Sequence, residues 1–180
     1  FLNSICIKIF NLFYYSFHKN NQKLKKDINN FFYPLDTVSN WNKLYGKNGF
    51  TQIQLLIKQN KDNKDLLIEI IKYFSEKGFY SYLTTLKEYG EGNKNFLSFG
   101  EKGLSITLDI PLKNSFSKVY EEFEKKFSNE YIKVYLAKDS FMSQTFFKNT
   151  YSKLNDFIEL QKRINSKSTF KSKLSQRLGL

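Results

Sequence analysis

The sequence predicts an α+β protein with a ferredoxin-like split β-α-β fold, an antiparallel sheet with helices on one face. Three observations predict this class. Two segments repeat apolar residues at helical spacing, four segments have the composition of strands, and together they follow the order β-α-β-β-α-β. The segments are 52–57, 63–77, 79–89, 103–110, 115–127 and 132–136. This fold leaves the second face of the sheet for a ligand or another domain.

The first 30 residues form a lead-in to this pattern. Residues 1–17 repeat apolar side chains at roughly helical spacing with one charge, Lys8, which predicts a helix packed on another part of the protein. A helix lying on a membrane surface is the alternative, although its polar face lacks the expected basic residues. Residues 18–30 are polar and predict a loop, with His18 at the surface. We therefore expect a lead-in over residues 1–30 and a functional domain over residues 31–180.

The first half of the domain contains a strand, a helix and a second strand. Gly49 precedes the strand at 52–57. Asp62 or Asn63 then begins a helix that Gly78 ends. The apolar residues of this helix form a single stripe: Leu66, Leu67, Ile70, Ile71 and Phe74. A β-rich run at 79–89 follows.

The second half repeats this arrangement. Residues 103–110 alternate leucine and isoleucine with Ser105, Thr107 and Asp109, which predicts a strand with one face in water. Asn114 is the expected cap of the next helix. Its stripe consists of Phe116, Val119, Tyr120, Phe123 and Phe127. After the last strand, two helices are expected, from Ser143 to about Asn149 and from Tyr151 to Ile164.

Length and composition exclude several classes of protein. A chain of 180 residues can bury a core of its own as one domain. The single cysteine, Cys6, excludes an intrachain disulfide and a cysteine-based zinc site, and we expect no metal site. With 26% charged residues and no apolar run near the ~20 residues of a membrane span, an integral membrane protein is excluded. Because the chain starts without methionine, we expect a fragment or a processed product.

The net charge of +12 raises the question of nucleic-acid binding. Lysines are spread through every segment, and Arg163 and Arg177 are the only arginines, whereas nucleic-acid surfaces favour arginine. Residues 102–109 echo the opening of an RNA-recognition signature, but aliphatic and acidic residues stand at its aromatic positions. We expect no nucleic-acid partner, and a basic RNA-binding module remains a distant alternative.

Polar residues on two of the strands predict a binding surface. Gln52 and Gln54 lie two residues apart, so both amides point to one side of the strand, and Ser105 and Thr107 do the same on another strand. Such mixed donors and acceptors suit the hydroxyl groups of a sugar-like substrate. A solvated sheet face is the alternative interpretation.

Several separate runs of residues resemble one family in the same order along the chain. The runs are Phe32–Asp36, Asn40–Gly46, Gln52–Gln54, Leu86–Asn93, Val134–Ser140 and the closing Arg177–Leu180. They resemble the C-terminal part of the decaprenylphosphoryl-β-D-ribose 2-oxidase family of FAD-linked oxidoreductases, in the vanillyl-alcohol-oxidase superfamily. The D-arabinono-1,4-lactone and gulonolactone oxidases are related to this family. The resemblance runs from about residue 31 to the end of the chain.

The resemblance implies the substrate-binding cap of an FAD-dependent enzyme that oxidises a sugar hydroxyl, with hydride passing to the flavin. It implies that FAD is held mainly by an N-terminal FAD-binding domain outside these 180 residues, so that this chain alone is inactive. The implied substrate is a sugar or a sugar phospholipid, and an aldonolactone oxidase is the alternative. The implied location is cytoplasmic, with a peripheral position at the inner membrane as a further alternative.

The resemblance also assigns individual residues. Lys138 is the implied catalytic residue, which reaches flavin and substrate, and Tyr135 is implied to contact both as well. Because these two are three residues apart, both can face one pocket only if the strand ends or bends between them. The other implied substrate-binding residues are Tyr33, Gln52, Gln54, Lys87, Ser105 and Thr107. The chain departs from mycobacterial members at three positions, with Ser105 for asparagine, Thr107 for cysteine and Phe141 for a commonly basic residue. These changes affect which substrate is expected, because hydrogen bonds in the pocket set specificity.

Overall fold

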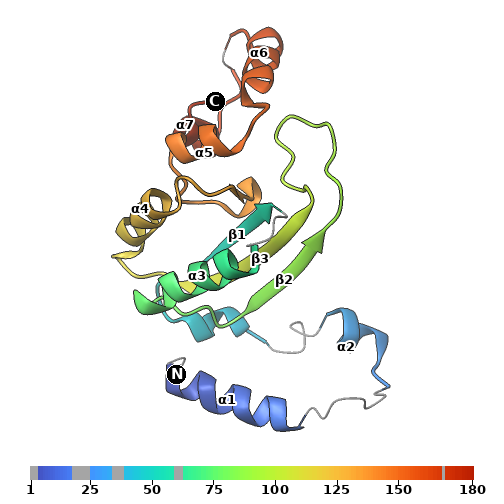
Figure 1. Ribbon diagram of the computed structural model, residues 1–180, viewed down its shortest axis with the longest axis vertical. Coiled ribbons are helices and arrows are strands. Elements are labelled where there is room, and N and C mark those ends of the chain that lie inside the picture. The colour runs from blue at the N-terminus through green and yellow to red at the C-terminus, as the bar shows by residue number, and fades with distance from the viewer. Residues whose placement is uncertain (1–3, 18–24, 34–38, 59–62, 168) are drawn as a thin grey trace. The chain divides into compact units, whose positions relative to one another are not determined.

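The computed structural model describes residues 4–17, 25–33, 39–58, 63–167 and 169–180 (Figure 1). The chain divides into two compact units, residues 1–50 and 51–180. The expectation of a functional domain that starts at residue 31 stays a prediction.

The described residues of the first unit form two α-helices and a 3-10 helix. They are α1 (Ser4–Phe17), α2 (Ile28–Phe32) and η1 (Trp41–Tyr45). The helix expected over residues 1–17 is confirmed from Ser4 to Phe17, and its expected packing on another part of the protein stays a prediction. The loop expected over 18–30 is wrong at its end, because α2 begins at Ile28. The side chain of Asp27 accepts a hydrogen bond from the backbone of Asn29 and thereby caps α2, a signal visible in the sequence. His18 lies outside the described residues.

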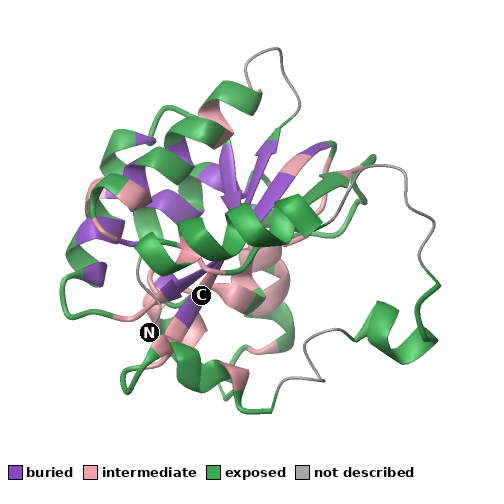
Figure 2. Cartoon of the chain, turned by 90° about the horizontal axis from the view of Figure 1, so that it is seen from below, coloured by how far each residue is buried: buried purple, intermediate pink, exposed green. Residues whose placement is uncertain are grey.

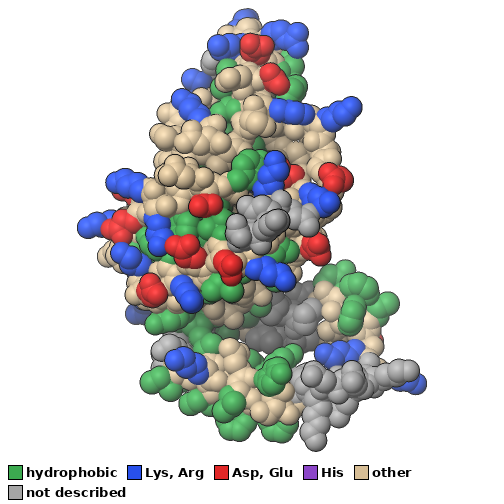
Figure 3. Space-filling view, viewed as in Figure 1, with side chains coloured by type: hydrophobic (Ala, Val, Ile, Leu, Met, Phe, Trp, Pro, Cys, Tyr) green, Lys and Arg blue, Asp and Glu red, His purple; other side chains and the backbone are tan. Residues whose placement is uncertain are grey.

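Helix α1 exposes apolar side chains. Figure 3 shows them as a hydrophobic surface over the helix, and most are more than half exposed: Ile5, Phe10, Leu12, Phe13, Tyr14, Tyr15 and Phe17. Further along the same unit, the ring of Tyr45 stacks on Phe50 with centroids 4.3 Å apart, and Trp41 packs against Phe50 at 5.4 Å. Phe50 is the first residue of strand β1.

The sheet contains four strands in the order β2-β3-β1-β4. They are β1 (Phe50–Lys58), β2 (Thr84–Tyr89), β3 (Gly103–Pro111) and β4 (Ile132–Val134). β2 pairs antiparallel with β3, with Leu86 opposite Ile106, and β1 pairs antiparallel with β4, with Leu55 opposite Val134. This order and the antiparallel pairing are those of the ferredoxin-like fold, so the predicted fold class is confirmed.

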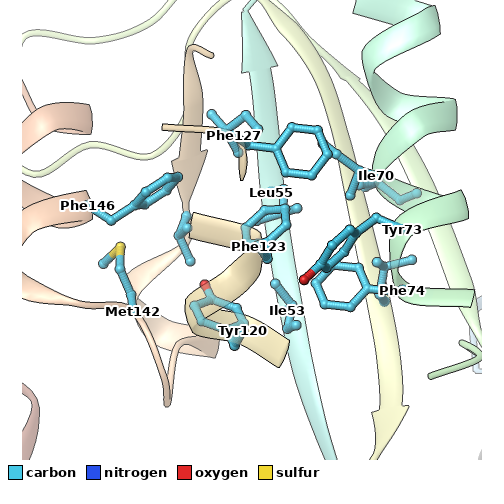
Figure 4. Close-up of a cluster of buried hydrophobic side chains, with 14 of the residues drawn as sticks. Ile53, Leu55, Ile70, Tyr73, Phe74, Tyr120, Phe123, Phe127, Met142 and Phe146 are labelled. Atoms are coloured by element: carbon cyan, nitrogen blue, oxygen red, sulfur yellow. The ribbon is translucent and has the colours of Figure 1, made fainter. Parts of the chain in front are cut away.

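Two helices cover one face of the sheet, α3 (Asn63–Glu76) and α4 (Phe116–Lys126) (Figure 1). Alternate residues of β1 and β3 face these helices and pack with them in one apolar core. Figure 4 shows how Ile53 and Leu55 lie among Ile70, Phe74 and Phe123 of the two helices. The buried sides of α3 and α4 turn toward the strands in Figure 2. The stripe predicted for α4 is buried as expected, whereas the stripe predicted for α3 is wrong at Ile71, which is exposed, and left out Tyr73, which is buried.

Several predicted boundaries differ from the structure. The second strand begins at Thr84 rather than Phe79, because the Ser81 hydroxyl accepts the backbone N–H of Asp109 and donates to the carbonyl of Leu83 in a turn. The fourth strand ends at Val134, since a 3-10 turn, η2 (Leu136–Lys138), follows at once. Ser115, not Asn114, occupies the position before α4.

In the described part of the chain after the sheet, three α-helices follow, one more than predicted. They are α5 (Gln144–Thr150), α6 (Leu154–Ile164) and α7 (Lys173–Leu178). The helix predicted from Ser143 to about Asn149 is observed as α5, with Ser143 as its N-cap. The missed helix α7 has a local signal, a capping box in which the Ser172 and Ser175 side chains each bond the other's backbone N–H. Its six residues are too short for helical periodicity to predict.

Candidate functional site

The face of the sheet opposite the helices carries a buried polar cluster. The amide nitrogen of Gln54 donates to the hydroxyl of Ser105 at 3.1 Å and to that of Tyr89 at 3.3 Å. Gln54 is 3% exposed and Ser105 is 1% exposed. The prediction that this face of β3 lies in water is therefore wrong. Side chains on neighbouring strands satisfy one another's hydrogen bonds, so polar residues alternating along a strand do not require water.

The strand register places further predicted residues on this face. Lys87 lies directly opposite Ser105, and alternation puts Thr107 on the same side of β3 as Ser105 and Gln52 on the same side of β1 as Gln54. Thr107 is buried, whereas Lys87 is exposed.

Asp109 shares this face and is 1% exposed, but the sequence analysis did not select it as a site residue. The alternation that identified Ser105 and Thr107 also includes Asp109, and this was the signal that could have found it.

Tyr135 follows β4 and adjoins the cluster through its backbone. Its N–H donates to the carbonyl oxygen of Gln54 at 2.9 Å. The Tyr135 ring packs on Phe99 with centroids 4.9 Å apart, and Phe99 contacts the ring of Tyr89 at 5.8 Å. Phe99 is 7% exposed and comes from the loop between β2 and β3, where no periodic pattern marks it. The rings of Phe99 and Tyr135 thus adjoin the polar cluster, with Phe99 in contact with the ring of Tyr89.

Lys138 lies at the end of the η2 turn. Its N–H donates to the carbonyl of Tyr135 at 3.0 Å, so the chain turns between these two residues. This is the change of direction that a shared pocket requires of two residues three apart. Lys138 is partly exposed. Its functional role, and its convergence with Gln52, Gln54 and Thr107, stay predictions.

The turn after Lys138 is anchored by a buried carboxylate that the sequence analysis missed. One oxygen of Asp139 accepts the backbone N–H groups of Phe141 and Met142, at 3.0 and 2.8 Å. Its other oxygen pairs with the guanidinium of Arg177 at 2.6 Å, and the Arg177 side chain also donates to the carbonyl of Met142. Helix α7 therefore holds the loop that begins next to Lys138.

A second carboxylate supports the same loop from α4. Glu124 accepts the backbone N–H of Ser143 at 2.7 Å. Burial raises the pKa of Glu124, the bond from Ser143 opposes this, and the negative charge of Asp139 adds to the rise. Burial also raises the pKa of Tyr120 well above its ordinary value, and the charges of Asp139 and Glu124 act in the same direction. These groups stabilise the loop and leave Tyr120 neutral at physiological pH.

Tyr33 belongs to the other unit of the chain. It lies at the C-terminal end of α2, and its side chain is 60% exposed. Its expected part in the same pocket stays a prediction.

Over the described residues the structure contains neither a metal site nor a membrane span. No group of three or more histidine, cysteine, aspartate or glutamate side chains in those ranges could hold a metal ion. Among the described helices, none combines the length and the apolar character that a membrane span requires.

Comparisons with known proteins found similarity to two curated proteins, one of which is an oxidase. No family model matches the chain. Decaprenylphosphoryl-beta-D-ribose oxidase of Mycolicibacterium smegmatis is 27% identical over 157 residues, which cover 86% of this chain and 33% of that protein. A Streptomyces coelicolor protein described as "Uncharacterized protein in mprA 5'region" is 28% identical over 118 residues, 65% of this chain and 32% of that protein. The chain thus spans about a third of the length of these curated relatives, at 33% and 32%. The chain is a distant homologue of decaprenylphosphoryl-β-D-ribose oxidase.

Proposed function

We propose that this chain is the substrate-binding part of a longer FAD-dependent oxidoreductase that oxidises a hydroxyl group of a sugar. The observation that carries the proposal is the buried cluster of Gln54, Ser105 and Tyr89 on the sheet face away from the helices. The name of the Mycolicibacterium relative supports an oxidase acting on a ribosyl lipid. A buried amide held by two hydroxyl groups suits the recognition of sugar hydroxyls, which both donate and accept hydrogen bonds.

The cluster would act by orienting the substrate. Gln54 is fixed by two hydrogen bonds of its own, so its amide does not have to be ordered when a sugar binds. In the structure Gln54 and Ser105 pair with each other, so a bound sugar would have to offer hydroxyl groups that replace this bond, because a polar group left unpaired costs about 1–3 kcal/mol. Ser105 and Thr107 would in this way contribute to the choice of sugar.

Lys138 would supply positive charge to the reaction. When bound, FAD accepts the hydride removed from the sugar carbon, and we propose that it is held mainly by a domain outside these residues. The eight glycines of the chain stand singly, without the clustered pattern of a pyrophosphate-binding loop. The residues present therefore fit the substrate side of the site. An ammonium group positioned where negative charge develops stabilises the transition state, and the anchored turn at Asp139 would keep Lys138 in place.

The finer assignment of substrate is a ribose carried on a polyprenyl phosphate, as in the name of the relative. Such a lipid substrate would bring the protein to a membrane surface as a peripheral protein. An aldonolactone is the alternative substrate.

The proposal is tested in the longer protein that contains this chain with bound FAD. Substrate-dependent loss of the visible flavin absorbance under anaerobic conditions reports sugar oxidation directly. Replacing the amide in Gln54→Leu should lower kcat/KM by about 10- to 100-fold, because a hydrogen-bonding group is lost from the site. Gln176→Leu, at an exposed position of α7, is the matched control and should leave kcat/KM unchanged.

Two outcomes would contradict the proposal. One is a longer protein that neither binds FAD nor oxidises a ribosyl lipid or an aldonolactone. The other is a folded Gln54→Leu variant with the kcat/KM of the control. Oxidation of the aldonolactone alone would support the oxidase and correct its substrate.

A further inference from the structure

A second polar site lies at one end of the sheet, in a cavity of about 380 Å³. Its lining includes Lys58 at the end of β1, several residues of the loop between Glu91 and Lys102, and residues 151–153. Tyr131, just before β4, and Lys133 within β4 complete it. In an antiparallel sheet of this order, the C-terminal ends of β1 and β2 and the N-terminal ends of β3 and β4 lie at the same end of the sheet. The volume lies at the small end of the range for ligand sites.

The cavity is separate from the cluster around Gln54. Neither Gln54, Ser105 nor Tyr89 lines it. Ser98 and Gly100 do line it, while Phe99 between them packs against Tyr89 and Tyr135. Different residues of this loop therefore line the cavity and contact the aromatic rings near Gln54.

The charge of the cavity is positive. Four lysines and two glutamates line it, a surplus of two positive charges. Lys102 pairs with Glu91 at 3.7 Å, with both side chains more than half exposed, so this pair is weak. The other glutamate, Glu101, is the one held inside the cavity wall.

Glu101 and Lys133 form an ion pair in the wall of the cavity. The Lys133 side chain is 10% exposed, its ammonium pairs with Glu101, and it donates to the carbonyl of Ser98 at 3.3 Å. Tyr131 donates to Glu101 at 2.8 Å. Burial raises the pKa of Glu101, but the bonds from Lys133 and Tyr131 and the charge of Lys58 lower it, and the net pKa lies below its ordinary value. Glu101 is thus ionised at neutral pH, and Lys133 balances its charge.

The surplus positive charge lies on Lys58 and Lys153, which are held by neutral groups. The Lys58 ammonium lies 5.0 Å from the ring centre of Tyr131. The Lys153 ammonium donates to the carbonyl of Lys94 at 2.9 Å. An ammonium on a ring or a carbonyl keeps its charge and further N–H donors for a ligand.

We propose that this cavity binds the phosphate group of a small ligand. A phosphate presents several acceptor oxygens with a charge of about −1.5 to −2 at pH 7, and lysines bind it as point charges. Asn93, Asn95 and Ser152 add neutral side chains to the same wall. The inference stands apart from the proposed oxidation, since it uses none of the residues assigned to that site.

Binding is measured on the 180-residue chain by titration calorimetry with inorganic phosphate and pyrophosphate, with chloride at equal ionic strength as the blank. We expect saturable binding with a dissociation constant at or below about 1 mM for pyrophosphate, which corresponds to about −4 kcal/mol. Lys58→Gln and Lys153→Gln should each weaken binding by about fivefold or more. Lys118→Gln, at an exposed position of α4, is the matched control and should bind as the unchanged chain does.

Two further arms distinguish the source of the phosphate. One uses a soluble sugar phosphate, and the other uses phosphatidylcholine vesicles with and without phosphatidic acid. Binding to either that depends on Lys58 and Lys153 supports the site, and vesicle binding alone identifies a lipid headgroup. Absence of saturable binding to all four probes would overturn the proposal, as would equal losses in the Lys118→Gln and Lys58→Gln variants.

Discussion

Removing Arg177 should destabilise the unit formed by residues 51–180. In Arg177→Met, the Asp139 carboxylate loses its charged partner while its side chain remains 1% exposed, and the carbonyl of Met142 loses a donor. Breaking a buried ion pair costs about 3–5 kcal/mol. Arg177 is 29% exposed, and Asp139 keeps two backbone N–H donors, so we reduce this to about 2–3 kcal/mol. In a domain of this size the change corresponds to a Tm lower by roughly 6–15 °C.

The assay is thermal unfolding followed by circular dichroism, with chemical denaturation to give the free energy of unfolding. Arg163→Met is the matched control, because Arg163 is the only other arginine and its side chain is exposed on α6. Its free energy of unfolding should change by less than about 0.5 kcal/mol. A Tm of Arg177→Met within measurement error of that of Arg163→Met would refute the anchoring of the Asp139 loop by α7.

Two further predictions concern the end of the sheet near the cavity. Gly103→Ala should lower the free energy of unfolding by about 1–3 kcal/mol, because the added Cβ would overlap the carbonyl oxygen of Ile57. Gly90→Ala is the control in the same denaturation assay, because its added Cβ has no atom within 4 Å. Glu101→Gln should destabilise the chain at neutral pH by about 1–3 kcal/mol. The folded pKa of Glu101 is lowered, so its contribution is complete above its ordinary pKa of 4.5 and is lost as pH falls through the folded value. Unfolding curves from pH 7 to pH 3 should therefore converge for the two proteins, and a constant difference would contradict the ion pair.

Helical periodicity predicted most of the side chains that α3 and α4 bury against the sheet. The stripes that include Phe74 and Phe123 pack on the sheet as expected, since apolar residues at helical spacing must be covered. The order of helices and strands then restricts the topology to few arrangements, and the ferredoxin-like order is the one observed. These parts of the fold depend on local patterns that a sequence displays directly.

The features of the site that the sequence did not predict depend on contacts between residues far apart in the chain. Ser105 and Gln54 are 51 positions apart, and their hydrogen bond converts an expected wet face into a buried one. Asp139 and Arg177 are 38 positions apart, so neither signals the ion pair in its own segment. Alternation correctly put Gln54 and Ser105 on one face, but it could not reveal that Phe99 from the loop would pack beside them.

The measurement that tests the central claim most directly is the rate of flavin reduction in the longer protein with Lys138→Ala. Rapid mixing of the oxidised protein with substrate under anaerobic conditions separates this rate from substrate binding. Loss of one positioned charge at a developing anion predicts a rate lower by about 10²- to 10³-fold, with little change in the concentration of substrate that half-saturates the rate. Lys148→Ala, at an exposed position of α5, should reduce its flavin at the unchanged rate. A folded, FAD-containing Lys138→Ala protein that reduces its flavin as fast as the Lys148→Ala control would contradict the account.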